Sequence, residues 1–562
     1  MMDFRKKGKI WVEENREKVI FALGLNLLVM ILFLIFMRPF YEVNDDLMLS
    51  GLANGSMALA DAHMIFLNYI LGLILIPLYR ICGAVSWYAI LQYLVVFFSF
   101  SAVTYVTMRR LKSNAGIWIS LLMLIFFGYE CYIKVQFTKT ASVAGIAGIF
   151  LIFYALEQKK VSFPAYFAGL ILACFGVMYR WRQFFACAAL MTGIGVFLLL
   201  KLREYQKQEC LRRFLTYVGG FGVLLGAAIG LIMLDNHMYN TDSAWSYYRE
   251  YNLARANLLD YGFPDYEENR STYEALGINE DAFHMYVSCN FNDPEKFSLD
   301  TMKTLIGLKE KTRLSKALIV QFLKKFPLNF FQTAAFYCFL LLGFLWLLWG
   351  SHKWSGWLTV FYEICAFGAV YFYMFYRGRY LVNRVDAGLW FGACTVLIWL
   401  LQAEKAKASG QTASLLCLSA VLLNQSSMWK DWRINAGPSA DLEQRAVLEE
   451  MSQDKEHLYL AKVGTISESS AYGIFDAMPK GLVSNINWLG GWETNSAGCI
   501  AALADYDVVN PFRDMINNEK VYLIDNNIKL TMRYINEFYD ETAEAVKVKK
   551  VGEYQIYQIK SK

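Results

Sequence analysis

The chain has 562 residues, of which 56% are hydrophobic and 16% aromatic but only 18% charged. Soluble proteins carry about 25% charged residues, so this composition excludes a soluble globular protein and indicates an α-helical polytopic membrane protein. A net charge of +5 leaves no basic face on so long a chain, which excludes nucleic acid as an expected partner.

The first apolar run, residues 19–37, follows a basic segment. Lys and Arg residues mark the cytoplasmic ends of membrane spans. The run ends at Arg38-Pro39 without the small residues of a cleavage site. We therefore expect an uncleaved signal anchor, with residues 1–18 in the cytoplasm.

The second apolar run, residues 64–79, is short for a span, which needs about 20 residues. If it crossed the membrane, the basic run that begins at Arg109 would lie outside. We therefore predict an interfacial helix within an outer loop of residues 38–86. The next span, residues 87–107, then runs from outside to inside.

The remaining apolar runs complete a membrane domain of about eleven spans over residues 19–428. Two polar segments, residues 235–325 and 429–562, are left on the outer face. We therefore expect a multi-pass protein of the plasma membrane with a cytoplasmic N-terminus. The later spans are predicted at residues 115–132, 140–156, 163–179, 183–200, 214–234, 328–350, 355–376, 385–402 and 412–428.

The last segment, residues 429–562, predicts a small extracytoplasmic α/β domain. Strand-like and helix-like stretches follow one another, and Asn527 stands at the N-cap position of the last helix. The predicted strands are residues 458–463, 521–524 and 554–559, and the predicted helices are residues 442–451 and 528–538.

Several patterns favour structural roles. The 11 cysteines form no CxxC pair and the 5 histidines show no metal-ligand spacing, so we expect neither a disulfide scaffold nor a zinc site. We interpret Gly490-Gly491-Trp492 as a structural turn with a packed tryptophan. His63 is interpreted as a hydrogen-bonded loop residue.

An acidic pair, Asp45-Asp46, lies just after the first span. Adjacent carboxylates at a membrane surface repel each other and are costly to desolvate, so the pair indicates a cation partner or a proton-transfer role. A solvated polar loop is the alternative.

The features that follow the acidic pair have a definite order. They are an amphipathic stretch at residues 47–54, then Ala60-Asp61-Ala62-His63, an apolar helix to Arg80, and Ser86-Trp87-Tyr88 at the start of the next span. This order resembles the GT-C superfamily of membrane glycosyltransferases, which includes protein O-mannosyltransferases, aminoarabinose transferases and oligosaccharyltransferases. In that family the first outer loop holds an acidic motif and two helices along the membrane, and an outer domain often follows the last span.

The resemblance covers the architecture of the whole chain, while its motifs lie within residues 38–112. Many relatives have a proline pair where this chain has Ala62-His63-Met64. This departure leaves the subfamily and the substrate open.

The resemblance implies that Asp45 and Asp46 are the catalytic pair. One would act as general base, and the other would orient the acceptor or bind a divalent cation; which aspartate does which stays open. Some relatives place a further acid near Glu130, which makes Asp46 and Glu130 the candidate metal ligands, with a solvated helix cap as the alternative for Glu130. Metal dependence varies within the family, so Mg²⁺ or Mn²⁺ is an optional cofactor.

The map also leaves arginines on the outer face, against the usual bias. The planar fork of Arg donors suits phosphate oxygens, whereas snorkelling to lipid head groups explains one or two such residues. Because the cluster falls in two short turns, we predict a donor-phosphate site, with Lys134 and Lys139 as weaker candidates. The five arginines are Arg180, Arg182, Arg377, Arg379 and Arg384.

These expectations lead to one reaction class and two alternatives. An outward-facing site has no access to cytoplasmic nucleotide sugars, so the donor is expected to be a polyprenyl-phosphate-linked sugar and the acceptor an envelope glycan, lipid or protein. The resemblance implies hexosyl or pentosyl transfer with inversion. A transporter or flippase of lipid-linked glycans is one alternative, for which Glu363 is the main candidate if it is more than a buried, hydrogen-bonded acid. A polymerase of such glycans is the other.

Overall fold

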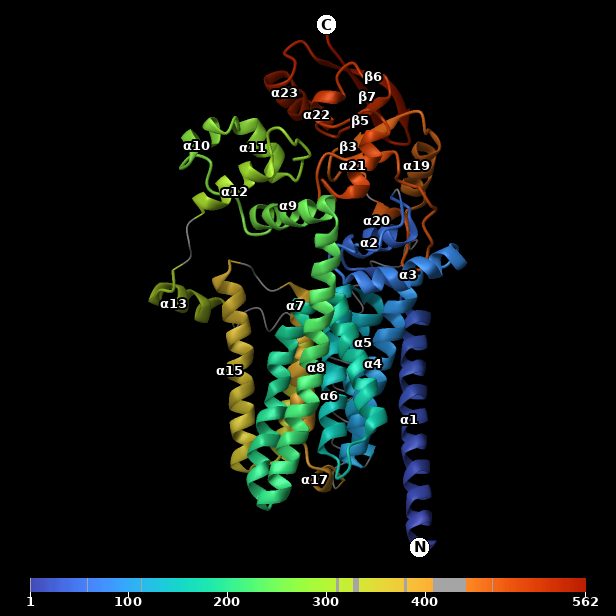
Figure 1. Ribbon diagram of the computed structural model, residues 1–562, viewed down its shortest axis with the longest axis vertical. Helices are drawn as coiled ribbons and strands as arrows, with labels where there is room; N and C mark the ends of the chain where they lie inside the picture. The colour runs from blue at the N-terminus through green and yellow to red at the C-terminus, as the bar shows by residue number, and fades with distance from the viewer. Residues whose placement is uncertain are drawn as a thin grey trace.

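The computed structural model describes residues 2–57, 59–112, 114–309, 313–326, 333–378, 382–407, 441–466 and 468–562. These residues form a bundle of long helices with a mixed α/β part at one end (Figure 1). We call the end that carries the C-terminal residues the outer end, and the end that carries the N-terminus and α17 the inner end.

Among the described residues, seven helices are long and apolar enough to cross a membrane, which confirms the polytopic helical fold. They are α1 (Met2–Phe36), α4 (Trp87–Leu111), α5 (Asn114–Gly128) with the π-helix η1 (Tyr129–Ile133), α6 (Phe137–Glu157), α7 (Phe163–Lys201), α8 (Lys207–Thr241) and α15 (Trp354–Tyr376). The bundle also contains α14 (Ala334–Trp349), the buried α16 (Asn383–Leu400) and the short η2 (Leu202–Glu204) and α17 (Ala403–Lys407). The predicted span at residues 412–428 lies outside the described residues.

Helix α7 combines two of the predicted spans and reverses direction between them. Arg180 has non-helical backbone angles (φ −166°, ψ 93°), and its guanidinium donates to Thr138 at the start of α6 (2.9 Å). The N–H before α7 donates to the Ala155 carbonyl, and Lys201 at the end of α7 pairs with Glu157 (3.5 Å). Both ends of α7 therefore lie beside the inner end of α6, and the turn at Arg180 lies at the outer end.

The first outer loop contains β1 (Phe40–Tyr41), α2 (Asp45–Asn54) and α3 (Tyr69–Ile81). Strand β1 pairs in parallel with β2 (Lys134–Val135), which follows η1. Helix α3 has 13 residues and lies across the outer end of the bundle (Figure 1). The prediction of a helix along the membrane at this position agrees with that arrangement.

The outer segment between α8 and α14 is helical. It comprises α9 (Ser243–Leu259), α10 (Arg270–Ala275), α11 (Glu280–Val287), α12 (Leu299–Leu308) and α13 (Lys316–Lys325).

The C-terminal segment forms a five-stranded sheet in the order β4-β3-β5-β7-β6. Strand β3 is parallel to β4 and β5, while β7 is antiparallel to β5 and β6. The elements are α19 (Leu442–Gln453), β3 (Leu458–Ala461), α20 (Glu468–Ala471), β4 (Ile486–Trp488), α21 (Ala497–Ala504), α22 (Pro511–Asp514), β5 (Val521–Ile524), α23 (Ile528–Phe538), β6 (Glu544–Val551) and β7 (Tyr554–Lys560).

The three predicted strands and two predicted helices of this segment are present at nearly the expected bounds. The predicted cap is wrong, because the Asn527 side chain makes no capping hydrogen bond to α23. Asp525 instead ties the start of α23 in place, since its carboxylate accepts from the Asn527 N–H (2.6 Å) and from the Thr531 hydroxyl.

The outer segment and the C-terminal sheet share one hydrophobic core, in which Tyr286 and Phe297 pack with Leu458 and Leu523. We call this unit the outer body. The sequence-based prediction had assigned its two parts to different domains, residues 235–325 to the membrane domain and residues 429–562 to a separate domain.

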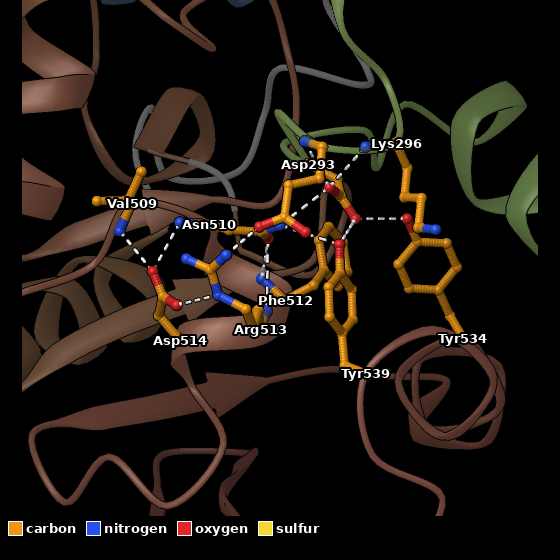
Figure 2. Close-up of polar contacts among 10 residues, drawn as sticks. Asp293, Lys296, Val509, Asn510, Phe512, Arg513, Asp514, Tyr534 and Tyr539 are labelled. Atoms are coloured by element: carbon orange, nitrogen blue, oxygen red, sulfur yellow. Dashed lines mark hydrogen bonds and ion pairs between the residues drawn. The ribbon is translucent and has the colours of Figure 1, made fainter. Parts of the chain in front are cut away.

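Asp293 ties the two halves of the outer body together (Figure 2). Its carboxylate is 1% exposed and accepts from the hydroxyls of Tyr534 (2.6 Å) and Tyr539 (2.5 Å) and from the Asn510 amide (3.0 Å). Arg513 also pairs with Glu295 of the outer segment. The Asp293 carboxylate also accepts from the N–H groups of Glu295 and Lys296 in its own segment. Because its three side-chain partners all belong to the C-terminal part, the carboxylate holds the outer segment against that part.

Candidate functional site

The acidic pair occupies the first turn of α2 at the outer end of the bundle. Carboxylates are favoured there because the first turn of a helix carries unpaired N–H groups and a positive partial charge. Consecutive residues of a helix point in directions about 100° apart. Asp45 and Asp46 therefore have different surroundings: Asp45 is half-buried, whereas Asp46 is 0% exposed.

Asp46 anchors α2 to the bundle. Its Oδ1 accepts from the Tyr88 hydroxyl (2.9 Å), the Gln92 amide (2.7 Å) and the Phe137 N–H (3.1 Å), which belong to α4 and α6. Burial raises the pKa of Asp46 to about 8, although the hydrogen bonds from Gln92 and Tyr88 lower it. The carboxyl group is therefore mainly protonated at neutral pH.

Asp45 lies among cationic groups from several elements. Burial raises the pKa of its carboxyl group, and the guanidinium groups of Arg384 and Arg180 oppose that effect. The Trp492 indole and Arg255 also lower the pKa of Asp45, by less. The carboxylate thus faces α7, α9, α16 and the loop after β4.

Two predicted arginines accompany Asp45. Arg180 stands at the turn of α7, where Thr138 orients its guanidinium and the Phe137 ring lies 5.1 Å below it. Arg384 is half-buried in the first turn of α16. Their shared effect on Asp45 shows that chain reversals far apart in the sequence bring both cations to the acidic pair.

The other predicted arginines have different surroundings. Arg182 is exposed and stacks on Trp181 at 5.2 Å. Arg377 is exposed and lies 5.6 Å from the ring of Tyr261 in the outer segment. Arg379 lies outside the described residues. The predicted set of five is therefore not gathered as one cluster among the residues that the structure describes.

An ion cluster centred on the buried Lys139 connects the elements that carry the site. Lys139 is 1% exposed and pairs with Glu42 and Glu130, both at 2.6 Å. Glu130 also accepts from the Asn383 amide (2.8 Å), and Asn383 directly precedes Arg384. The cluster thus joins the chain before α2, the π-helix, α6 and the start of α16. Single π-turns occur often at functional sites.

Asp46 and Glu130 do not fit the divalent-cation site that the sequence suggested. The Oδ1 of Asp46 already accepts three hydrogen bonds from α4 and α6. The Oε2 of Glu130 is engaged by Lys139 and Asn383. Within the described ranges, no three His, Cys, Asp or Glu side chains are grouped to hold a metal ion. No step proposed below uses one.

His63 is a hydrogen-bonded loop residue, as predicted. Its Nδ1 lies 2.7 Å from the Asp61 carboxylate, and its ring stacks on Trp245 at 4.5 Å. These contacts join the first outer loop to α9.

Sequence reasoning missed two residues beside Asp45. Arg255 lies in the polar outer segment, to which the sequence assigned no site residue, and Trp492 follows a glycine pair that was interpreted as a turn. The glycine pair was the available signal, because two adjacent glycines mark a backbone path that other residues do not adopt.

Comparisons with known proteins give a distant likeness. No protein-family model and no curated protein matches the chain. Among solved structures, ArnT from Cupriavidus metallidurans bound to undecaprenyl phosphate is similar at 12% identity and a TM-score of 0.42, over 96% of this chain and 97% of that one. The apo state of the same ArnT gives 12% identity and a TM-score of 0.41, over the same shares. Because both measures are low, the functional proposal rests on the residues of this chain.

Proposed function

We propose that this protein is a membrane glycosyltransferase that moves a sugar from a polyprenyl-phosphate-linked donor to an envelope acceptor at the outer face of the membrane. The observation that carries the proposal is the half-buried Asp45 carboxylate beside Arg180 and Arg384 at the outer end of the bundle. A base next to phosphate-binding cations at a membrane surface suits a donor whose phosphate is anchored by a lipid.

The proposed reaction is a single displacement. The Asp45 carboxylate takes the proton of an acceptor hydroxyl while that oxygen bonds to the anomeric carbon of the donor sugar. The bond between the anomeric carbon and the phosphate oxygen breaks, and polyprenyl phosphate leaves. Arg180 and Arg384 stabilise the charge that develops on the phosphate. Attack from the face opposite the leaving group gives inversion.

The surroundings of the acidic pair support Asp45 as the base. A base must be in reach of substrate, and Asp45 is half-exposed. Burial raises the pKa of Asp45, while Arg384 and Arg180 beside it act in the opposite direction and favour the charged form. Asp46 is buried, mainly protonated and bonded to three groups of the bundle. It holds the first turn of α2 so that Asp45 faces the arginines.

A transporter of lipid-linked glycans is the second candidate, and one observation favours it. Glu363 in α15 is 4% exposed, and neither carboxylate oxygen has a hydrogen-bond partner among the described residues. The expected hydrogen bond of this acid is therefore absent from that part of the chain. Buried acids within spans often mark transport pathways, but a single acid at this position accounts for none of the groups around Asp45.

Glycan analysis of the cell envelope tests the proposal. A deletion strain would be complemented with wild type, Asp45→Asn or the exposed control Asp300→Asn, after equal membrane levels are confirmed. We expect wild type and Asp300→Asn to restore the missing sugar and Asp45→Asn to lower it by about 10²-fold or more, the usual effect of losing a general base. Full restoration by Asp45→Asn would contradict the proposal, and flipping of lipid-linked glycans would then be measured.

A further inference from the structure

The loop after β4 brings the C-terminal sheet to the acidic pair. In open α/β sheets, the loops that leave the carboxyl ends of parallel strands are the usual ligand-binding edge. Here the loop begins at Leu489, whose N–H donates to the Ala461 carbonyl and whose carbonyl accepts from the Asn292 N–H (both 2.9 Å). Three residues later, Trp492 lies close enough to Asp45 to affect its carboxylate.

Two glycines fix the path of this loop. A Cβ on Gly490 would lie 1.7 Å from the Cys289 carbonyl oxygen, so the backbones of the loop and the outer segment meet without room for a side chain. Gly491 has φ +97°, which side chains rarely allow. Both halves of the outer body therefore determine where Trp492 lies.

Trp492 continues an aromatic row that ends at a phosphate-binding candidate. Its ring meets Phe66 edge-on at 5.1 Å, Phe66 stacks on Phe137 at 6.1 Å, and Arg180 lies over Phe137. The Trp492 carbonyl accepts from the Tyr248 hydroxyl of α9 (2.7 Å). The tryptophan is thus held at the backbone while its side chain packs on Phe66.

The indole of Trp492 is directed at the proposed base, since its N–H acts as a hydrogen-bond donor that lowers the pKa of Asp45. Two residues further on, the Thr494 hydroxyl is 2% exposed and has no hydrogen-bond partner among the described residues. Buried polar groups are nearly always satisfied in folded proteins. The Thr494 hydroxyl is therefore a group that the loop leaves for a hydroxyl of its ligand.

We propose that Trp492 is a positioning residue that packs against a pyranose ring while its indole N–H faces Asp45, so that the outer body completes the site. Sugar faces rich in C–H groups pack well on aromatic rings, and tryptophan adds a polar edge. This inference rests on the proposed function. The ring belongs to the donor or to the acceptor, both of which present the same chemistry.

The test compares Trp492→Ala and Trp492→Phe with Asp45→Asn in the full-length protein. We expect Trp492→Ala to lower the restored envelope sugar about tenfold, within the range for losing one side-chain contact to substrate, and Trp492→Phe to restore part of it. Purified Trp492→Ala in detergent should keep the wild-type thermal unfolding midpoint. It should also bind farnesyl phosphate within twofold of wild type, whereas Arg384→Ala should bind it more weakly.

Transfer kinetics, measured with Trp492→Ala in membranes of the deletion strain, show whether the pyranose ring belongs to the donor or to the acceptor. A raised KM for the lipid-linked donor places it on the donor, and a raised KM for the acceptor places it on the acceptor. Wild-type sugar levels with Trp492→Ala, while Asp45→Asn remains inactive, would overturn this inference alone. Loss of farnesyl phosphate binding in Trp492→Ala would also overturn it, because the tryptophan would then support the phosphate site. Full activity of Asp45→Asn would overturn the proposed function, and this inference with it.

Discussion

The two ends of α6 carry charge clusters of opposite composition. At the outer end, Lys139 lies between Glu42 and Glu130. At the inner end, Glu157 lies between Arg110 (2.5 Å) and Lys201 (3.5 Å). The central lysine of the outer cluster is 1% exposed, whereas Lys201 at the inner end is 37% exposed.

The charge rule of membrane topology accounts for the inner cluster but not for the outer one. Excess cations at the inner end follow the rule that Lys and Arg mark the cytoplasmic side of a membrane protein. Buried acids around one lysine do not follow from that rule, and they cost free energy unless each charge is paired. The outer cluster holds Asn383 and the chain before α2, and it therefore sets where Arg384 and Asp45 meet.

Removing the central cation of the outer cluster should have the largest effect. Lys139→Met leaves two partly buried carboxylates without the buried cation between them, which costs up to roughly 3–5 kcal/mol. The more exposed Lys201→Met at the inner end should cost less than about 1 kcal/mol. Thermal unfolding of the detergent-solubilised proteins measures both. Adding Glu130→Gln to Lys139→Met should recover part of the loss, and equal effects at the two ends would contradict the comparison.

Removing a cation beside Asp45 should change the pH dependence of transfer. Arg384 lowers the pKa of Asp45, so Arg384→Ala raises that pKa further. A general base works only when deprotonated, and the acid limb of the rate profile should therefore move to higher pH. Arg384→Lys should move it less, and neither Arg182→Ala nor Lys201→Ala should move it. A limb that stays in place in Arg384→Ala would show that Asp45 is not the titrating base.

The smallest effect is expected for Asp46→Asn. Asn presents the same Oδ1 to Tyr88, Gln92 and Phe137, and it resembles the protonated acid. Because folding raises the pKa of Asp46 from 3.8 to about 8, its stabilisation is fully present below pH 4 and is lost as pH rises through 8.

The unfolding midpoint of wild type should consequently fall between pH 5 and pH 9 by more than that of Asp46→Asn. These two pH values lie on either side of the pKa of about 8 that Asp46 has in the folded state. An inactive but stable Asp46→Asn protein would place Asp46 in the chemistry and weaken its role as an anchor.

Local patterns predicted much of the fold. Hydropathy and charge located the spans, the helix along the membrane and the reversal at Arg180, since these depend on runs of neighbouring residues. Strand β4 escaped notice because it has only three residues, and β6 because Lys side chains interrupt its apolar positions. The Asp293 contacts join residues more than 200 positions apart, which no local pattern encodes.

The site was predicted in part for the same reason. The acidic pair and two of its arginines were found, but adjacent aspartates look alike in a sequence, and only packing against α4 and α6 distinguishes Asp46 from Asp45. Glu130 was suggested as a metal ligand by resemblance alone. Its pairing with Lys139 was not foreseen, because it depends on the turn between η1 and α6.

The shared core of the outer body sets an order of events during synthesis. The ribosome makes the outer segment before α14, α15 and α16, and the strands that cover it come last. Side chains such as Tyr286 and Phe297 are therefore synthesised before the strands that cover them. A chain that stops before β3 would keep the apolar face of the outer segment exposed. Cellular quality control recognises such exposed apolar surface.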